Sequence, residues 1–264
     1  MLDFTGRVAV VTGAAMGMGN ATARLLAKQG ATVCLLDISD GVEVAARELV
    51  DSGYKAYGYK VNVTDQVDVD RVFDNIVAEH GLVDHLVNSA GIARLSSMFD
   101  EQADANLQAM IDVNIIGLWN TSKAALRSMV EKKKGSIVNF SSVTGTFVAD
   151  AHEVGYAATK SAVWGMTKAM CMEFVTEGVR VNMVCPGMIR TPMVEKSAAE
   201  MMPDNPEAVL SAIGASVPMG RMGTPEEAAN AVAFLLSDEA SYITGREIVF
   251  DGASTLPETN VKSD

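Results

Sequence analysis

A tyrosine and a lysine four residues apart are the pair in this sequence with the clearest capacity for chemistry. Tyr156 and Lys160 lie in a stretch from 154 to 176 whose apolar residues recur at helical spacing, so both side chains share one helix face. An ammonium beside a phenol favours the phenolate and lowers a pKa that is ordinarily about 10. The pair is therefore a candidate for proton transfer near neutral pH. The same spacing is also common on solvated helix faces, so the pair needs support from other residues.

Two further polar side chains are candidates to complete such a site. Ser142 follows an apolar run at 136–140 that predicts a strand, and Ser141 beside it is the alternative. Asn114 stands among apolar neighbours in a helical stretch from about 104 to 131. Because burying an amide without partners costs about 1–3 kcal/mol, Asn114 must either bridge structure or serve the site.

A glycine-rich turn near the amino terminus predicts a site for an anion. The apolar run 8–11 indicates a buried strand, and residues 21–27 continue as a helix that ends at Gly30. Unpaired N–H groups at the start of that helix, together with its dipole, suit a pyrophosphate if glycine clears the approach. The spacing differs from the usual G-x-G-x-x-G, so a simple tight turn is the alternative, and the glycines concerned are Gly13, Gly17 and Gly19.

An acidic residue at the end of the next apolar run indicates which dinucleotide would bind. Asp37 follows residues 32–36, where a carboxylate reaches the two ribose hydroxyls of an adenosine and repels a 2′-phosphate. No Arg or Lys between Thr12 and Asn20 would neutralise such a phosphate. We therefore expect NAD rather than NADP, with a solvated loop carboxylate as the alternative for Asp37.

Strand and helix patterns alternate along the whole chain, which predicts parallel pairing with right-handed crossovers. The expected fold class is α/β, a Rossmann-type doubly wound parallel seven-stranded sheet with helices on both faces. Thr64 is expected to cap a helix at 66–79, and Thr224 to Glu227 form a capping box that opens a helix to about 236. The expected strands are 8–11, 32–36, 55–61, 85–88, 136–140, 180–184 and 247–250.

Composition narrows the class of protein. The 264 residues show no break that would mark a boundary, so we expect a single dinucleotide-binding domain over 1–264. A net charge of −12 argues against nucleic acid or an anionic membrane as partner. No leader segment and no apolar run long enough to cross a bilayer are present, so a cytoplasmic location is expected. The three cysteines form no C-x-x-C pair and are expected to be buried, and no metal site is expected.

Taken together, the motifs resemble the short-chain dehydrogenase/reductase family over residues 6 to about 252. Two departures are Ser89, where a second Asn is usual, and Asn62, where many members carry Asp. Asn62 keeps an acceptor for the adenine. The motifs stand in the family's order as Thr12-Gly13-x-x-x-Gly17-x-Gly19, Asp37, Asn88-Ser89-Ala90-Gly91, Asn114, Ser142, Tyr156-x-x-x-Lys160 and Pro186-Gly187.

The resemblance implies a role for each catalytic candidate. Tyr156 would move the substrate proton, Lys160 would lower the tyrosine pKa and hold the nicotinamide ribose, and Ser142 would bond the substrate oxygen. Asn114 would distort its helix and hold a water that links Lys160 to solvent. The residues expected to bind NAD are Gly13, Met16, Gly17, Met18, Asp37, Asn62, Val63, Asn88, Ala90, Gly91, Tyr156, Lys160, Pro186, Gly187, Ile189 and Thr191.

The segment from about 188 to 222 corresponds to the family's substrate lid. With the expected pocket residues it favours a bulky alicyclic secondary alcohol or ketone, such as a hydroxysteroid or bile acid. A polyol would need more hydrogen-bonding groups, and a 3-oxoacyl thioester on an acidic carrier would need a basic entrance. The apolar residues concerned are Met188, Met193, Met201, Met202, Met219 and Met222 in the lid, and Leu95, Met98, Phe147 and Val148.

Two hypotheses from other functional classes were weighed against an oxidoreductase. A non-catalytic NAD sensor would be expected to lose Ser142, Tyr156 or Lys160, and a methyltransferase would have no reason to keep all three. The resemblance also implies a homotetramer in which the helices at 104–131 and 154–176 pair across two-fold axes. The polar tail from Pro257 to Asp264 is expected either to be disordered or to reach a neighbouring subunit.

Overall fold

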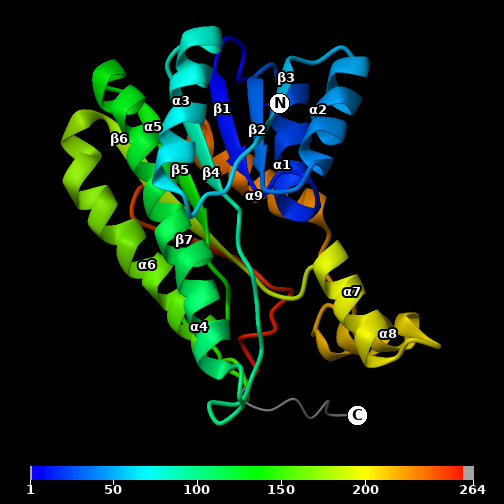
Figure 1. Cartoon of the computed structure of the whole chain (residues 1–264). Helices are drawn as coiled ribbons and strands as arrows, with labels where there is room; N and C mark the ends of the chain where they lie inside the picture. The colour runs from blue at the N-terminus through cyan, green and yellow to red at the C-terminus, as the bar shows by residue number, and fades with distance from the viewer. Residues whose placement is uncertain (1, 258–264) are drawn as a thin grey trace.

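Seven parallel strands form the centre of the molecule. The computed structural model describes residues 2–257, so the predicted behaviour of the tail after Pro257 lies outside the described residues. The strands are ordered β3-β2-β1-β4-β5-β6-β7, as Figure 1 shows, and this confirms the predicted α/β fold. Their bounds are β1 Val8–Thr12, β2 Thr32–Asp37, β3 Ala56–Lys60, β4 His85–Asn88, β5 Gly135–Phe140, β6 Val179–Pro186 and β7 Glu247–Phe250.

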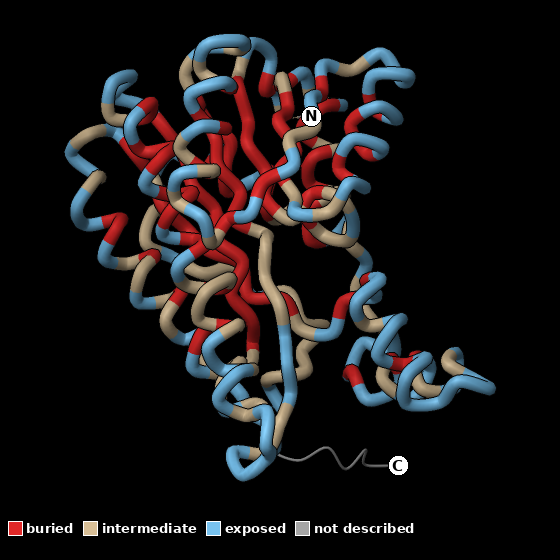
Figure 2. The backbone as a smooth tube through the Cα atoms, in the orientation of Figure 1, coloured by how far each residue is buried: buried red, intermediate tan, exposed pale blue. Residues whose placement is uncertain are grey.

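Helices cover both faces of this sheet, and each helix layer packs against the sheet to form a separate apolar core. Helices α1 (Gly17–Lys28), α2 (Gly41–Asp51) and α9 (Pro225–Leu236) share one core with Ala9 and Val11 of β1. Val8 and Val10 of the same strand face the other core. Successive strand side chains point to opposite faces, so a strand that is covered twice must be apolar throughout. Figure 2 shows these buried strands between the two helix layers.

The second layer contains α3 (Gln66–His80), α5 (Leu118–Lys132) and α6 (Val154–Phe174), which pack against the other face of the sheet. Here the structure corrects the continuous helix expected at 104–131. That stretch is α4 (Ala103–Ile111), a π-helical segment η1 (Asp112–Gly117) and then α5. Apolar periodicity does not reveal the change, because a π-turn shifts the register only within one turn.

The predicted cap of α3 is also wrong by one residue. Asp65, and not Thr64, accepts hydrogen bonds from the N–H groups of Val67 and Asp68, at 2.9 and 3.2 Å. Thr64 is engaged elsewhere, since its N–H and hydroxyl both donate to Asn62 Oδ1. The capping box that opens α9 at Thr224 is confirmed.

The segment between β6 and α9 stands away from the main body in Figure 1. It contains α7 (Pro192–Met201) and α8 (Pro206–Ser216), and a bridge between Ile189 and Gly223 joins its two ends. Two short 3₁₀ helices, η2 (Val175–Glu177) and η3 (Asp238–Ala240), complete the described chain. Within residues 2–257, no helix has the length and apolar character needed to cross a membrane.

Candidate active site

The strand order reverses between β1 and β4, and the loops that follow these strands diverge there. In a doubly wound sheet, ligands bind at this switch point, beyond the carboxyl ends of the strands. A cleft of about 440 Å³ lies at this place. Six residues expected to bind the cofactor line it, namely Gly13, Asp37, Asn62, Val63, Ala90 and Gly91.

Each glycine in the turn after β1 is required for its own structural reason. A Cβ atom at Gly13 would lie 2.9 Å from the backbone of Ala90, and one at Gly19 would overlap the Gly13 carbonyl oxygen. Both positions therefore need glycine for close approach. A Cβ atom at Gly17 would meet only ordinary van der Waals contacts, at 3.8 Å or more, but its φ of 62° is in the left-handed region that favours glycine.

The start of α1 fits an anion. Met16 occupies the N-cap position, and no described side chain caps the helix there. The first N–H groups of α1 are thus without a side-chain acceptor, as a pyrophosphate site requires. The segment that contains α7 and α8 begins close by, because a Cβ atom at Gly17 would lie 3.9 Å from Thr191. Met18 packs on the core, and Thr191 caps α7 by accepting from Val194 N–H at 3.4 Å.

Asp37 is held in a fixed orientation at the end of β2. Its two carboxylate oxygens accept hydrogen bonds from Ala15 N–H at 3.1 Å and Ser39 N–H at 3.0 Å. Lys60 pairs in register with Asp37, but its ammonium lies 2.6 Å from Asp40 instead. The Asp37 carboxylate is thus held in place at the edge of the cleft.

Two asparagines expected to contact the cofactor use their side chains within the protein. Asn88 donates to Ser122 and Asn139, each at 2.9 Å, and accepts from Thr121 at 2.7 Å. Its buried side chain fixes the end of β4, so a role of Asn88 in cofactor binding stays a prediction that concerns the backbone at this strand end. The Oδ1 atom of Asn62, expected to accept from the adenine, already accepts from Thr64.

The end of β6 is packed against the end of β7. Pro186 is the last residue of β6, and a Cβ atom at Gly187 would lie 2.7 Å from Asp251 Cβ. This contact explains the glycine at position 187. Ile189 is buried at the base of the lid segment, where it faces Gly223.

Tyr156 and Lys160 share one face of α6, as predicted from their spacing. The Lys160 Nζ atom lies 5.6 Å from the centre of the Tyr156 ring and donates to the Phe140 carbonyl oxygen at 3.0 Å. Lys160 is buried, and burial lowers the pKa of its ammonium to about 8. The group still carries a charge at pH 7.

The prediction that Lys160 lowers the Tyr156 pKa below its usual value is wrong for this structure. Burial raises the pKa of the phenol, the hydrogen bond with Ser142 lowers it, and the negative charge of Glu153 raises it further. Lys160 directs its ammonium to a carbonyl oxygen on β5. Burial disfavours the phenolate more strongly than the described neighbours stabilise it.

The structure separates the two serine candidates. Ser142 is the serine that lies near enough to the Tyr156 hydroxyl to lower its pKa, and the Ser142 Oγ accepts from Thr144 N–H at 3.1 Å. Ser141 donates instead to the Lys160 carbonyl oxygen at 2.9 Å. The geometry therefore supports Ser142 as the serine of the site.

Asn114 lies in the π-helical segment η1 and links it to the end of β4. Its Oδ1 accepts from Ile92 N–H at 2.9 Å, and its Nδ2 donates to Ile92 O at 3.0 Å and Thr159 Oγ1 at 3.1 Å. A Cβ atom at Gly91 would lie 3.3 Å from Asn114 Oδ1 and 3.6 Å from Lys160 Nζ. Asn114 therefore lies beside the lysine, in a helix that is distorted as expected.

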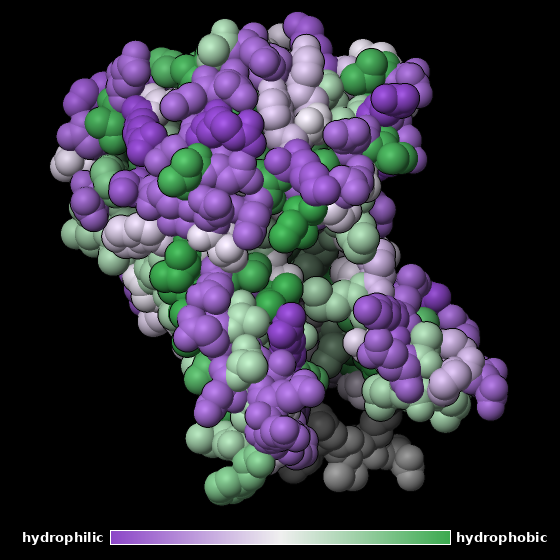
Figure 3. Space-filling view, in the orientation of Figure 1, coloured by the Kyte–Doolittle hydropathy of each residue, from purple (hydrophilic) through white to green (hydrophobic). Residues whose placement is uncertain are grey.

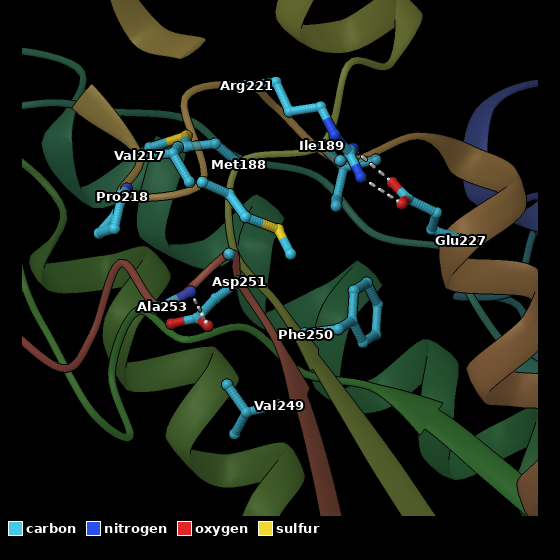
Figure 4. Close-up of a pocket in the computed structure, with 13 residues that line it drawn as sticks. Met188, Ile189, Val217, Pro218, Arg221, Glu227, Val249, Phe250, Asp251 and Ala253 are labelled. Atoms are coloured by element: carbon cyan, nitrogen blue, oxygen red, sulfur yellow. Dashed lines mark hydrogen bonds and ion pairs between the residues drawn. The ribbon is translucent and has the colours of Figure 1, made fainter. Parts of the chain in front are cut away.

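A second hollow, of about 560 Å³, lies behind the base of the lid segment. Figure 4 shows it between Met188, Phe250 and the paired Arg221 and Glu227, whose side chains are 2.7 and 2.9 Å apart in two hydrogen bonds. The described residues that line it include none of the catalytic candidates, Asn114, Ser142, Tyr156 and Lys160. Its lining includes Ile189, one of the residues expected to bind the cofactor, and Phe250 and Asp251 at the carboxyl end of β7.

Sequence reasoning missed one residue of this neighbourhood. Glu153 immediately precedes α6, and its charge acts on Tyr156. Its position three residues before the tyrosine was the signal available in the sequence. Among residues 2–257, no group of His, Cys, Asp and Glu is arranged to hold a metal ion, and Cys34, Cys171 and Cys185 are free and buried as expected.

Comparison with known proteins agrees with this geometry. Residues 13–255 match the family model described as enoyl-(acyl carrier protein) reductase. The chain is 44% identical to oxidoreductase UcpA of Escherichia coli strain K12, over 98% of both chains. It is 40% identical to cis-4-hydroxycyclohexanecarboxylate dehydrogenase of Sinomonas cyclohexanicum, over 96% of this chain and 98% of the relative.

A solved structure is similar over nearly the whole fold. The gluconate 5-dehydrogenase of Burkholderia cenocepacia, in complex with NADP and tartrate, superposes with a TM-score of 0.86 at 31% identity, over 96% of each chain. Similarity of this extent covers both the cleft and the catalytic candidates. The chain belongs to the short-chain dehydrogenase/reductase family, whose members are oxidoreductases with a nicotinamide cofactor.

Proposed function

We propose that this chain transfers a hydride between NAD and a secondary alcohol or its ketone, with a bulky alicyclic compound as substrate. The observation that carries the proposal is the meeting of Ser142, Tyr156 and Lys160 beside a cleft that ends in Asp37. The cofactor, when bound, supplies the hydride acceptor or donor. The protein supplies alignment and proton transfer.

Each polar group in the site has one proposed task. The Tyr156 hydroxyl gives its proton to a ketone oxygen or takes it from an alcohol. Ser142 bonds the same substrate oxygen, and Lys160 holds the nicotinamide ribose and supplies positive charge near the phenol. Asn114 is a positioning residue that fixes the end of β4 and holds the water that connects Lys160 to solvent.

NAD is proposed over NADP because Asp37 would lie against the adenosine ribose. A carboxylate there accepts from both ribose hydroxyls and repels a 2′-phosphate. The similar gluconate 5-dehydrogenase was solved with NADP, so the proposal of NAD rests on Asp37 and not on that relative. The remaining residues proposed for the cofactor include the turn after β1 and the segment from Pro186 to Thr191.

The proposed substrate class rests on the apolar surface around the site. Figure 3 shows hydrophobic residues gathered along the hollow between the main body and the α7–α8 segment, which we propose as the lid of a single-domain enzyme. One relative is named for its action on a hydroxycyclohexanecarboxylate, an alicyclic alcohol. The exposed apolar side chains nearby are Leu95, Met98, Phe147, Val148, Met188 and Met193.

The test is an alcohol panel with NAD, read as kcat/KM from NADH formation at 340 nm. Tyr156→Phe should reduce oxidation by the ~10²–10⁴ that general acid/base catalysis supplies, with NAD binding kept. Tyr242→Phe, at a fully exposed tyrosine, is the matched control and should be unchanged. Near wild-type turnover in Tyr156→Phe would show that another group moves the proton.

We also propose a homotetramer with α5 and α6 at the subunit contacts, since closed symmetry is usual among homo-oligomers. Light scattering at micromolar concentration tests this, and a monomer would contradict it. The cytoplasmic location stays a prediction.

A further inference from the structure

Arg94 is an exposed arginine beside the cleft, and its charge has no described partner. It lies in the segment between β4 and α4, and it lines the cleft of about 440 Å³ at the switch point. Within residues 2–257, its guanidinium forms neither an ion pair nor a hydrogen bond. Other arginines of the chain are neutralised, since Arg24, Arg190 and Arg221 each pair with a glutamate. A cation left without a partner at a cleft is therefore a candidate for binding an anion.

A second, smaller cavity of about 160 Å³ also has Arg94 in its wall. Of the described residues, Arg94 is the one that lines both this cavity and the larger cleft. Sites for whole ligands usually have about 300–1,000 Å³, so the smaller cavity suits a substituent of a larger molecule. The other polar residues in its wall are Ser96, Ser97, Asp104 and His152.

The backbone that carries Arg94 is held against α4 and α6. The Arg94 N–H donates to Met110 Sδ at 3.4 Å, and the Ser96 N–H donates to the His152 carbonyl oxygen at 3.0 Å. The two helices are themselves in close contact, because a Cβ atom at Gly155 would lie 2.7 Å from Met110 Cε. A guanidinium on a backbone fixed in this way loses less freedom when it binds a ligand.

Both cavities that Arg94 lines reach the catalytic candidates. Gly155 lines the smaller cavity and directly precedes Tyr156 on α6. Gly91 lines the larger cleft, and a Cβ atom there would lie 3.6 Å from Lys160 Nζ. A substrate whose reacting oxygen meets Tyr156 can therefore extend a substituent along its ring towards Arg94.

The chemistry of the arginine selects the substituent. A guanidinium presents a planar fork of N–H donors that matches the two oxygens of a carboxylate. Two acidic residues line the same cavities, but neither pairs with Arg94 within the described residues. Asp112 accepts from Gln108 Nε2 at 2.7 Å, and Asp104 lies in the first turn of α4.

We propose that Arg94 is a specificity-determining residue that binds a carboxylate on the substrate, so that the enzyme prefers alicyclic hydroxy acids to uncharged alcohols of the same shape. This inference rests on the proposed function and narrows its substrate class. The carboxylate enters the smaller cavity, where the hydroxyl groups of Ser96 and Ser97 are further donors. Repulsion from Asp104 limits the gain, so we expect an effect at the lower end of the range for charged hydrogen bonds.

The experiment measures kcat/KM for 3- and 4-hydroxycyclohexanecarboxylate and for the corresponding carboxamides, with NAD and with NADP. Each carboxamide matches its acid in shape but has no charge. The wild type should prefer at least one acid to its carboxamide by about tenfold, as a hydrogen-bonded charge pair predicts. Arg94→Gln should remove that preference and keep carboxamide oxidation within about threefold of wild type. Arg94→Lys retains the charge without the planar fork and should keep only part of the preference.

Arg246→Gln is the matched control. Arg246 is also exposed and has no ion pair within residues 2–257, but it directly precedes β7, at the opposite edge of the parallel sheet. The control removes the same charge and should leave the preference for the acid unchanged.

Two results would overturn the inference and leave the proposed dehydrogenase intact. One is a wild type that uses acids and carboxamides equally, or a preference that Arg94→Gln does not alter. The other is a rise in the KM for NAD in Arg94→Gln that is equal with both kinds of substrate, because Arg94 would then bind the cofactor. Failure of the wild type to oxidise any of the compounds with either cofactor would overturn the proposed substrate class and this inference together.

Discussion

Replacement of Lys160 by methionine should stabilise the protein while it abolishes activity. The ammonium is buried, and its only described hydrogen bond is to the Phe140 carbonyl oxygen. Burial lowers its pKa from 10.5 to about 8, and one pKa unit corresponds to about 1.4 kcal/mol. Holding the charged lysine in the folded protein at pH 7 therefore costs about 3 kcal/mol. Methionine has a similar length and no charge.

The expected gain is smaller than this cost, because the bond to Phe140 is lost with the amine. That loss amounts to about 1 kcal/mol, so a net gain of about 2 kcal/mol remains. For a chain of this size it corresponds to a rise in Tm of about 4–8 °C. Scanning calorimetry of both proteins at pH 7 and equal concentration measures it. Lys168→Met, at the lysine that lies 3.3 Å over the Trp164 ring on the same helix, is the control and should lower the Tm slightly.

The pH dependence of the free energy of unfolding tests the effect of the Lys160 charge more directly than the Tm at pH 7. The folded pKa of Lys160 is below its unfolded value, so the penalty is complete below pH 8, where both states carry the charge. As the pH rises from about 8 to 10.5, the folded lysine loses its proton first and the wild type gains stability relative to Lys160→Met. The difference in free energy of unfolding between the two proteins should therefore shrink over this range. A variant less stable than wild type at pH 7, or a difference that is constant with pH, would refute the reasoning.

Three further outcomes are expected. Asp37→Ala should weaken NAD use and relax discrimination against NADP, which kcat/KM with each cofactor measures, and a wild type that already prefers NADP would contradict our interpretation of Asp37. Asn114→Ala leaves the N–H and carbonyl of Ile92 without their bonds, so denaturant unfolding should show a loss of about 2–4 kcal/mol, with a lower kcat. Because burial raises the Tyr156 pKa while Lys160 loses its charge near pH 8, oxidation should rise with pH through neutrality up to about pH 8, and a plateau near pH 7 in a pH–rate profile would contradict this.

The fold was predictable because its strands carry a strong local signal. Val8 to Val11 are apolar at every position, and the structure shows why: alternate residues enter two different cores. Such a strand requires helices on both faces, and the alternation of elements then requires a parallel sheet. The glycine turn was equally accessible, since both close approach and left-handed φ demand the same residue type.

What the sequence did not predict depends on partners far along the chain. A distortion at Asn114 was expected only from the family resemblance, and periodicity within the helix contains no trace of the bond from Asn114 to Ile92, 22 residues away, that accompanies the π-helical segment. Asn88 was expected near the cofactor because of its place at the strand end, but the bonds of its side chain were not predicted. Its bonds to Ser122 and Asn139 come from elements that assemble only in the fold. Helix spacing predicted which residues meet, but not which atoms they use.

Burial of Lys160 lowers the stability of the folded protein, and burial of Tyr156 favours the proposed transfer of its proton to a ketone. It lowers the Lys160 pKa and raises that of Tyr156, so each group is displaced toward its neutral form. A neutral phenol is the form that donates a proton to a ketone oxygen, and the raised pKa keeps it populated at neutral pH. Oxidation needs the phenolate and so depends on positive charge at Lys160, which pH 7 preserves because the lysine pKa remains near 8. A more exposed lysine would be more stably charged but would act through water, where its attraction for the phenolate is far weaker. In the proposed mechanism, the stability lost at Lys160 is thus the consequence of burying a charge 5.6 Å from the centre of the Tyr156 ring.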